Sequence, residues 1–176
     1  MFKASWKEQL DQKLAQAAAR KRQNELLPAP LRVALVGVGN ELNGDDAAGN
    51  QVATRLLALS GFPAHFLPIN AGSLPENASG VLRRFEAELV ILVDAANFGG
   101  EPGGIQWLEA SQIGGMSASS HTLPLSVLGQ FLEAELNCRV EYLGVQPAQT
   151  EFDTAPDPRI DKAVDEIVGK FSTLFL

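Results

Sequence analysis

Three side chains suited to metal or acid–base chemistry stand where apolar segments of the chain end. Asp46 follows the apolar run 33–36 and a glycine-containing turn. Asp94 ends the run 89–93, and His121 lies in a loop ahead of a helical pattern. Two carboxylates and an imidazole suit a divalent first-row metal and leave open positions for a substrate. The three are far apart in the chain and form no compact signature, so this chemistry depends on the fold bringing them together.

Each of these residues also has a purely structural interpretation. Asp45 or Asp46 could cap the helix that begins there. His121 could bond backbone groups at a helix entry, whereas Asp94 needs a specific partner because it stands beside a buried run. Four other residues are interpreted as structural: His65 inside an apolar strand, Cys138 as a buried unreactive thiol, and Trp6 and Trp107 as packing residues.

Nucleotide binding and serine hydrolysis fit the sequence less well. The segment 37–42 begins like a dinucleotide-binding loop, but Leu42 stands in place of the third glycine. Glu41 and the two following aspartates would also repel a pyrophosphate. The chain contains neither a GxxxxGK[ST] loop nor a GxSxG elbow.

Strand-like and helix-like segments alternate after residue 31, which predicts a three-layer α/β/α fold around a mostly parallel, twisted sheet of about five strands. The segment 105–108 is expected to run antiparallel at an edge, because its connection is too short for a parallel crossover. The small-residue stretch 111–120 is expected as a loop. Strands are predicted at 32–37, 64–70, 89–93, 105–108 and 139–145, and helices at 46–59, 75–88, 124–136 and 159–174.

The N-terminal segment differs in charge from the rest of the chain. Six basic and three acidic residues give residues 1–27 a charge of +3, so the remainder of this −7 chain carries −10. Apolar residues every four positions, and a capping-box pattern at Ser5 and Glu8, predict a helix over 5–26. We therefore divide the chain into an amphipathic helical extension, 1–30, and one domain, 31–176. The extension is interpreted as a helix packed on its own domain or a frayed appendage, in preference to a docking arm.

The composition narrows the class of protein. A chain of 176 residues with 45% hydrophobic residues suits one globular domain with a full core. A net charge of −7 argues against nucleic-acid binding. No apolar run reaches the length of a membrane span, no signal peptide is visible, and the single cysteine fits a reducing compartment. A cytoplasmic monomer is expected.

Five motifs in order resemble those of the hydrogenase maturation endopeptidases, in particular the branch that processes the large subunit of hydrogenase 3 of formate hydrogenlyase. The motifs are Gly37-Val38-Gly39-Asn40 with Gly44-Asp45-Asp46, Gly72-Ser73-Leu74-Pro75-Glu76-Asn77, Val93-Asp94-Ala95, Ser120-His121-Thr122-Leu123-Pro124 and Gly144-Val145-Gln146-Pro147. The resemblance implies a twisted sheet flanked by helices. It also implies removal of a C-terminal extension from the precursor of a [NiFe]-hydrogenase large subunit after nickel insertion.

By the same resemblance, Asp46, Asp94 and His121 are the residues that contact the metal and carry catalysis, and Asp45 has a neighbouring or capping role. The metal would be nickel carried by the substrate precursor, with other divalent metals as substitutes. Asn70 stands where close relatives often have an acid. Two alternatives from other classes stay open: a small-molecule metallohydrolase that uses the same triad, and a non-catalytic maturation chaperone that senses nickel.

Overall fold

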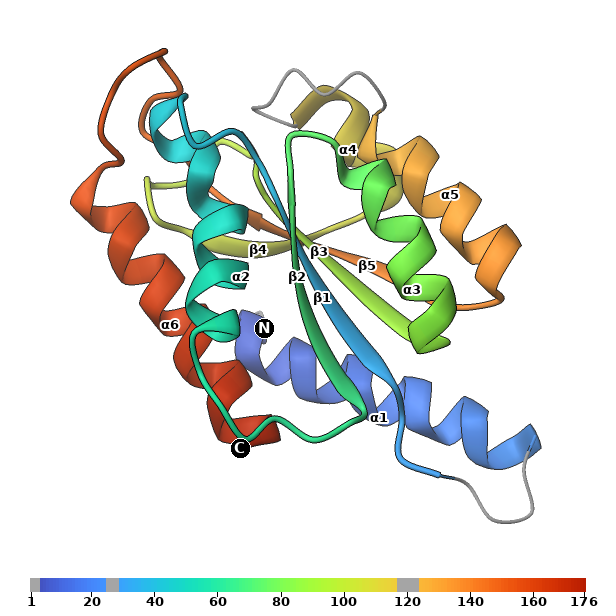
Figure 1. Cartoon of the computed structure of the whole chain (residues 1–176). Helices are drawn as coiled ribbons and strands as arrows, with labels where there is room; N and C mark the ends of the chain where they lie inside the picture. The colour runs from blue at the N-terminus through green and yellow to red at the C-terminus, as the bar shows by residue number, and fades with distance from the viewer. Residues whose placement is uncertain (1–3, 25–28, 117–123) are drawn as a thin grey trace.

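The computed structural model describes residues 4–24, 29–116 and 124–176, arranged around a five-stranded sheet in the order β2-β1-β3-β5-β4 (Figure 1). Neighbouring strands run parallel except β4, which pairs antiparallel with β5 at the edge. The predicted α/β/α architecture and its antiparallel edge strand are therefore confirmed. The strands are β1 (Val33–Val38), β2 (Phe66–Gly72), β3 (Leu89–Ala95), β4 (Ile105–Leu108) and β5 (Arg139–Val145).

Helices cover both faces of the sheet. Figure 1 shows α2 and α6 on one face and α3 and α5 on the other. The helices are α1 (Trp6–Asn24), α2 (Ala48–Leu57), α3 (Ser79–Phe85), α4 (Ala110–Met116), α5 (Leu125–Leu136) and α6 (Pro158–Phe175), with two 3-10 turns, η1 (Gly44–Ala47) and η2 (Pro75–Ala78). In the described part of the chain, no helix combines the length and apolar character that crossing a bilayer requires.

Two hydrophobic cores result from the alternation of side chains along the central strands. Val33 and Leu35 of β1 face the core formed with α1, α2 and α6. Ala34 and Val36 face the opposite core, formed with α3, α4 and α5. Every residue of β1 and β3 is buried, which explains why these strands are continuous apolar runs with no polar alternation.

The N-terminal helix α1 packs on the domain. Trp6 and Leu10 are buried in the same core as α2 and α6. The indole N–H of Trp107 in β4 donates to the backbone oxygen of Trp6 at 2.8 Å, and the indole N–H of Trp6 donates to Glu166 of α6 at 2.8 Å. The two tryptophans interpreted as packing residues thus join α1 to the edge strand and to the last helix.

Polar contacts hold both ends of α1. Ser5 N–H donates to the Glu8 carboxylate at 2.7 Å and Glu8 N–H donates to Ser5 Oγ at 3.3 Å, which confirms the predicted capping box. Near the other end, Lys21 forms an ion pair with Glu88 at 2.8 Å. The helix is therefore built into the domain over its described length.

The prediction of a loop over 111–120 is wrong as far as Met116, because α4 occupies this stretch. Ile113 of α4 is buried in the core on the α3 and α5 side. Gln112 stabilises the first turn, since its side-chain oxygen accepts from Glu109 N–H at 3.0 Å. Burial of Ile113 overrides the low helix propensity of two consecutive glycines, which local sequence alone does not reveal.

The placement of His65 inside a strand is also wrong. His65 lies in the turn that precedes β2, where its half-buried ring meets the edge of Phe175 with ring centroids 6.3 Å apart. Its interpretation as a structural residue is unaffected.

Candidate active site at the carboxyl edge of the sheet

The carboxyl ends of β1 and β3 lie side by side, so the residues that follow them share one edge of the sheet. Gly37 of β1 pairs with Val93 of β3 in parallel register. Asp94 therefore stands level with the last residue of β1, and η1 with Asp46 follows at the same edge. In open α/β sheets, this is the edge at which ligands bind.

Two glycines allow η1 and the start of α2 to lie close against the strand ends. A Cβ atom on Gly49 would lie 2.1 Å from the Val93 oxygen and 2.3 Å from the Val38 oxygen. A Cβ atom on Gly39 would lie 1.9 Å from the backbone oxygen of Asp46. Gly39 also has a φ of +146°, which disfavours other residues. A side chain at position 39 would push η1 away from the strand ends, and a side chain at position 49 would push α2 away from them.

The carboxylate of Asp46 is held by the turn that precedes it. Asp46 is 1% exposed, and its Oδ2 accepts a hydrogen bond from Asn40 N–H at 2.9 Å. Its own N–H donates to Asn43 oxygen at 3.1 Å. The amide of buried Asn50 donates to Gly39 oxygen at 2.8 Å and fixes the other side of the same turn. The orientation of Asp46 is thus set by local backbone.

Asp94 is 5% exposed and lies at the carboxyl end of β3. It shares its strand face with Leu92, so its side chain is on the face covered by α4 and α5. It borders a narrow cavity together with Leu125 and Tyr142. Burial raises the pKa of Tyr142 to about 12, so this phenol stays protonated at neutral pH.

His121 lies outside the described residues, in the chain between α4 and α5. Both of these helices pack on the sheet face that carries Asp94. The approach of His121 to Asp46 and Asp94 therefore stays a prediction. Within residues 4–24, 29–116 and 124–176, no three His, Cys, Asp or Glu side chains cluster closely enough to hold a metal ion.

Asp45 has a role that the sequence did not reveal. It is completely buried, and its carboxylate accepts hydrogen bonds from the N–H groups of Ala148 at 2.7 Å, Gln149 at 2.9 Å and Asp157 at 2.6 Å. The alternative that Asp45 caps the following helix is wrong, since η1 and α2 have no side-chain cap. Asp45 instead ties a distant loop to η1.

Gln146 was also missed as a site-building residue. Its side-chain oxygen accepts from Phe98 N–H and Gly100 N–H, both at 3.0 Å, and so holds the glycine-rich loop after β3. The available signal was a polar residue directly after the apolar strand 139–145, the same position in the pattern that Asp94 has after 89–93.

An open cavity of about 420 Å³ adjoins the turn that holds Asp46. It lies at the carboxyl ends of β1 and β2, and its lining is polar: Gly39, Asn40, Glu41, Asn50, Asn70, Ala71, Gly72 and Ser73. Asn70 is engaged within the protein, because its Nδ2 donates to Thr54 Oγ1 and its Oδ1 accepts from Gly72 N–H, both at 3.0 Å.

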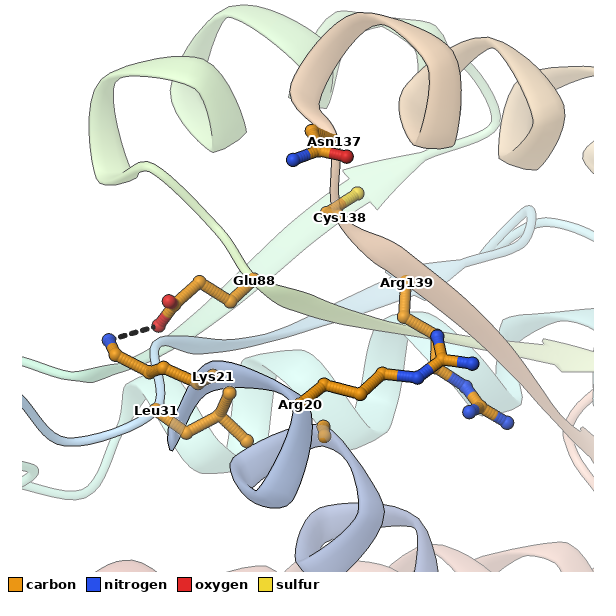
Figure 2. Close-up of a pocket in the computed structure, with 8 residues that line it drawn as sticks. Arg20, Lys21, Leu31, Glu88, Asn137, Cys138 and Arg139 are labelled. Atoms are coloured by element: carbon orange, nitrogen blue, oxygen red, sulfur yellow. Dashed lines mark hydrogen bonds and ion pairs between the residues drawn. The ribbon is translucent and has the colours of Figure 1, made fainter. Parts of the chain in front are cut away.

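A second cavity, of about 380 Å³, lies at the opposite edge of the sheet, between α1 and the start of β5 (Figure 2). Arg20 of α1 and Arg139 of β5 lie near each other at one side of it, and the Lys21–Glu88 ion pair closes the other. Cys138 lines this cavity as a half-buried thiol, and burial raises its pKa to about 11, in keeping with the unreactive role expected. None of the predicted site residues in the described chain is at this edge.

The chain is similar to known proteins in both sequence and fold. A family model described as hydrogenase maturation protease matches residues 51–173. The hydrogenase 3 maturation protease of Escherichia coli (strain K12) is 31% identical over 134 residues, which cover 76% of this chain and 84% of that protein.

Solved structures give the same result. The [NiFe] hydrogenase maturation protease HycI from Thermococcus kodakarensis KOD1 aligns with a TM-score of 0.73 and 31% identity over 81% of this chain and 91% of that one. The endopeptidase HycI from Escherichia coli aligns with a TM-score of 0.69 and 30% identity over 79% of this chain and 88% of that one. Family model, sequence relatives and fold agree with the motif resemblance, and the chain belongs to the hydrogenase maturation protease family.

Proposed function

We propose that this chain is an endopeptidase that removes the C-terminal extension from the precursor of a [NiFe]-hydrogenase large subunit after nickel insertion. The observation that carries the proposal is the placement of two buried carboxylates, Asp46 and Asp94, after neighbouring strands at one edge of the sheet. Membership of the protease family supports the reaction class, and the names of the relatives support a hydrogenase as the source of the substrate.

The chemistry of the pair supports nickel of the substrate as the recognition element. A divalent ion presented by the precursor would find carboxylate ligands in Asp46 and Asp94, with His121 as a nitrogen ligand. Only a loaded precursor would then place its scissile peptide at this edge. Other divalent first-row metals are expected to substitute, because oxygen and imidazole ligands accept several of them.

Two routes to hydrolysis fit these residues. The metal ion could polarise the scissile carbonyl, with Asp46 or Asp94 acting as general base toward a water molecule. Alternatively, the ion could lower the pKa of a bound water and generate the nucleophile. In both routes the protein supplies the carboxylates and the fixed turn, and the precursor supplies the metal and the peptide.

The surroundings of Asp46 have room for a polypeptide. The cavity of about 420 Å³ beside Asn40 is open to solvent and lined by polar groups, which suits peptide backbone.

We take the enzyme to act as a cytoplasmic monomer, in keeping with its one free cysteine, Cys138.

The test is to mix the purified protein with nickel-loaded and with nickel-free precursor and to follow the mass of the large subunit. We expect loss of a C-terminal peptide from the loaded precursor only. Equal cleavage of both forms would remove nickel as recognition element, and no cleavage of either would overturn the proposed reaction.

Two measurements in the same experiment separate the alternatives. Specific binding of the loaded precursor without cleavage would indicate a nickel-sensing chaperone. Tight binding of free nickel to the protein, with no binding of either precursor, would indicate a small-molecule metallohydrolase.

A further inference from the structure

The segment Ala148–Asp157, called the strap below, is tied at both ends to one buried side chain. Oδ2 of Asp45 accepts from Ala148 N–H and Gln149 N–H, and Oδ1 accepts from Asp157 N–H at 2.6 Å. Backbone N–H of Asp45 also donates to Gln149 oxygen at 3.2 Å. A carboxylate that accepts three backbone hydrogen bonds makes charge-assisted contacts of the strong kind. The strap is therefore fixed to the residue adjacent to Asp46.

The middle of the strap is fixed to the turn before η1. Asp153 N–H donates to Leu42 oxygen at 2.8 Å, and Thr154 forms a parallel bridge with Asn43. The strap lies directly on Gly44, where an added Cβ atom would be 2.6 Å from Thr154 Oγ1 and 2.5 Å from Gln149 Nε2. The strap and the turn before η1 thus form one ordered unit.

This ordered unit presents two apolar side chains to solvent. Phe152 of the strap is 73% exposed and Leu42 of the turn is 60% exposed. Their backbones are joined through the hydrogen bond from Asp153 to Leu42. A rigid backbone that displays a large exposed aromatic residue is the arrangement of a preorganised contact surface, because little side-chain or loop entropy is lost on binding.

Acidic residues flank the two apolar residues in the chain. Glu41, Glu151 and Asp153 are all exposed, and among the described residues none of them forms an ion pair. A partner with an apolar side chain and positive charge beside it would match this surface. Leu42 N–H donates to Asn40 Oδ1 at 3.0 Å, and Asn40 N–H donates to the Asp46 carboxylate at 2.9 Å, so a polypeptide bound at Asp46 lies next to this surface.

We propose that Leu42 and Phe152 form the contact surface for the substrate segment next to the scissile bond, a segment with an apolar side chain and net positive charge. We also assign Asp45 as the positioning residue that holds this surface in register with Asp46. The inference rests on the proposed function and adds to it the residues that select the polypeptide.

The surface is tested with Phe152→Ala and Leu42→Ala, and with Phe131→Ala as matched control. Phe131 lies on α5 and is 48% exposed, so its truncation removes a similar exposed ring from a different part of the molecule. For Phe152→Ala we expect KM for precursor processing to rise about tenfold with kcat nearly unchanged. KM of the unaltered protein should also rise with salt, because added ions screen the three carboxylates. Phe131→Ala should match the unaltered protein.

The role of Asp45 is tested with Asp45→Asn, which keeps one accepting oxygen and replaces the other by an amide nitrogen that cannot accept. Amide hydrogen exchange at positions 148, 149 and 157 should become faster, and KM should rise while kcat changes little. Combined with Phe152→Ala, the increase in KM should be smaller than the product of the two single effects, because both variants remove the same contact. Independent, fully multiplicative effects would overturn the positioning role.

Affinity of the precursor for each variant is measured beside cleavage, so that the two proposals fail in different ways. Cleavage by the unaltered protein decides the proposed function. Binding decides the surface: weaker binding by Phe152→Ala than by Phe131→Ala supports it, and equal binding overturns it whether or not the precursor is cleaved.

Discussion

Asp45 and Asp46 are consecutive in the chain, but their carboxylates accept hydrogen bonds from N–H groups that are far apart in the sequence. Asp45 accepts from Ala148, Gln149 and Asp157, whereas Asp46 accepts from Asn40. Successive side chains in a 3-10 turn point about 120° apart, so one can be directed into the strap and the other toward the sheet edge. Asp45 therefore holds the distant segment 148–157, and Asp46 is held by the turn that precedes it.

Removing either candidate catalytic carboxylate should abolish processing. We expect Asp46→Asn and Asp94→Asn to lower kcat/KM for the precursor by at least about 100-fold, because an amide neither acts as a general base nor compensates a divalent ion. The free energy of unfolding should change by about 1 kcal/mol or less, since the shape is kept. Mass spectrometry of the precursor and urea unfolding measure the two effects. Asp165→Asn, at an exposed carboxylate of α6, is the control, and normal cleavage by Asp46→Asn would contradict the assignment.

The histidine of the predicted triad has a natural control, because the chain contains only two histidines. His121→Ala should remove precursor cleavage, since the metal loses its nitrogen ligand. His65→Ala should leave kcat/KM within about twofold, because His65 lies in the turn before β2 and packs against Phe175. Equal activity of the two variants would exclude His121 from the site.

The free energy of unfolding should decrease at acid pH because of Asp157, the residue that precedes α6. Hydrogen bonds from the Arg159 side chain and N–H lower the pKa of Asp157 to about 2, from an ordinary value of 3.8. A carboxyl group whose pKa is lower in the folded state stabilises the protein above pH 3.8, and this contribution is lost as the pH falls toward 2. Urea unfolding of the unaltered protein and of Asp157→Asn should differ most above pH 4 and converge near pH 2. A difference independent of pH would contradict this role.

The N-terminal helix should contribute to the stability of the whole domain. Leu10 is completely buried against α6 and the sheet, so Leu10→Ala should lower the free energy of unfolding by about 2–5 kcal/mol. Gln12→Ala changes an exposed position of the same helix and should have an effect near zero. A single cooperative transition with reduced stability is expected in denaturant titrations. Unchanged stability of Leu10→Ala would show that α1 folds apart from the domain.

Much of the fold could be predicted from local sequence. The strands at 105–108 and 139–145 lie within the predicted bounds, because turn residues flank each apolar run. The antiparallel direction of β4 followed from the length of its connection. The helix over 110–116 could not be predicted, since the burial of Ile113 against a distant core outweighs the local preference of its glycines.

The sequence by itself determined the residue types and their order: Asp46 and Asp94 directly after buried runs, His121 before a helix, and the glycines that a close turn needs. The tertiary structure alone decided that β1 and β3 are neighbours, and so brought Asp46 and Asp94 to one edge. It also decided that Asp45 holds the strap, because the N–H groups that donate to its carboxylate lie more than 100 positions further along the chain. Local patterns record burial and periodicity, but a contact over such a separation exists only once the sheet order is formed.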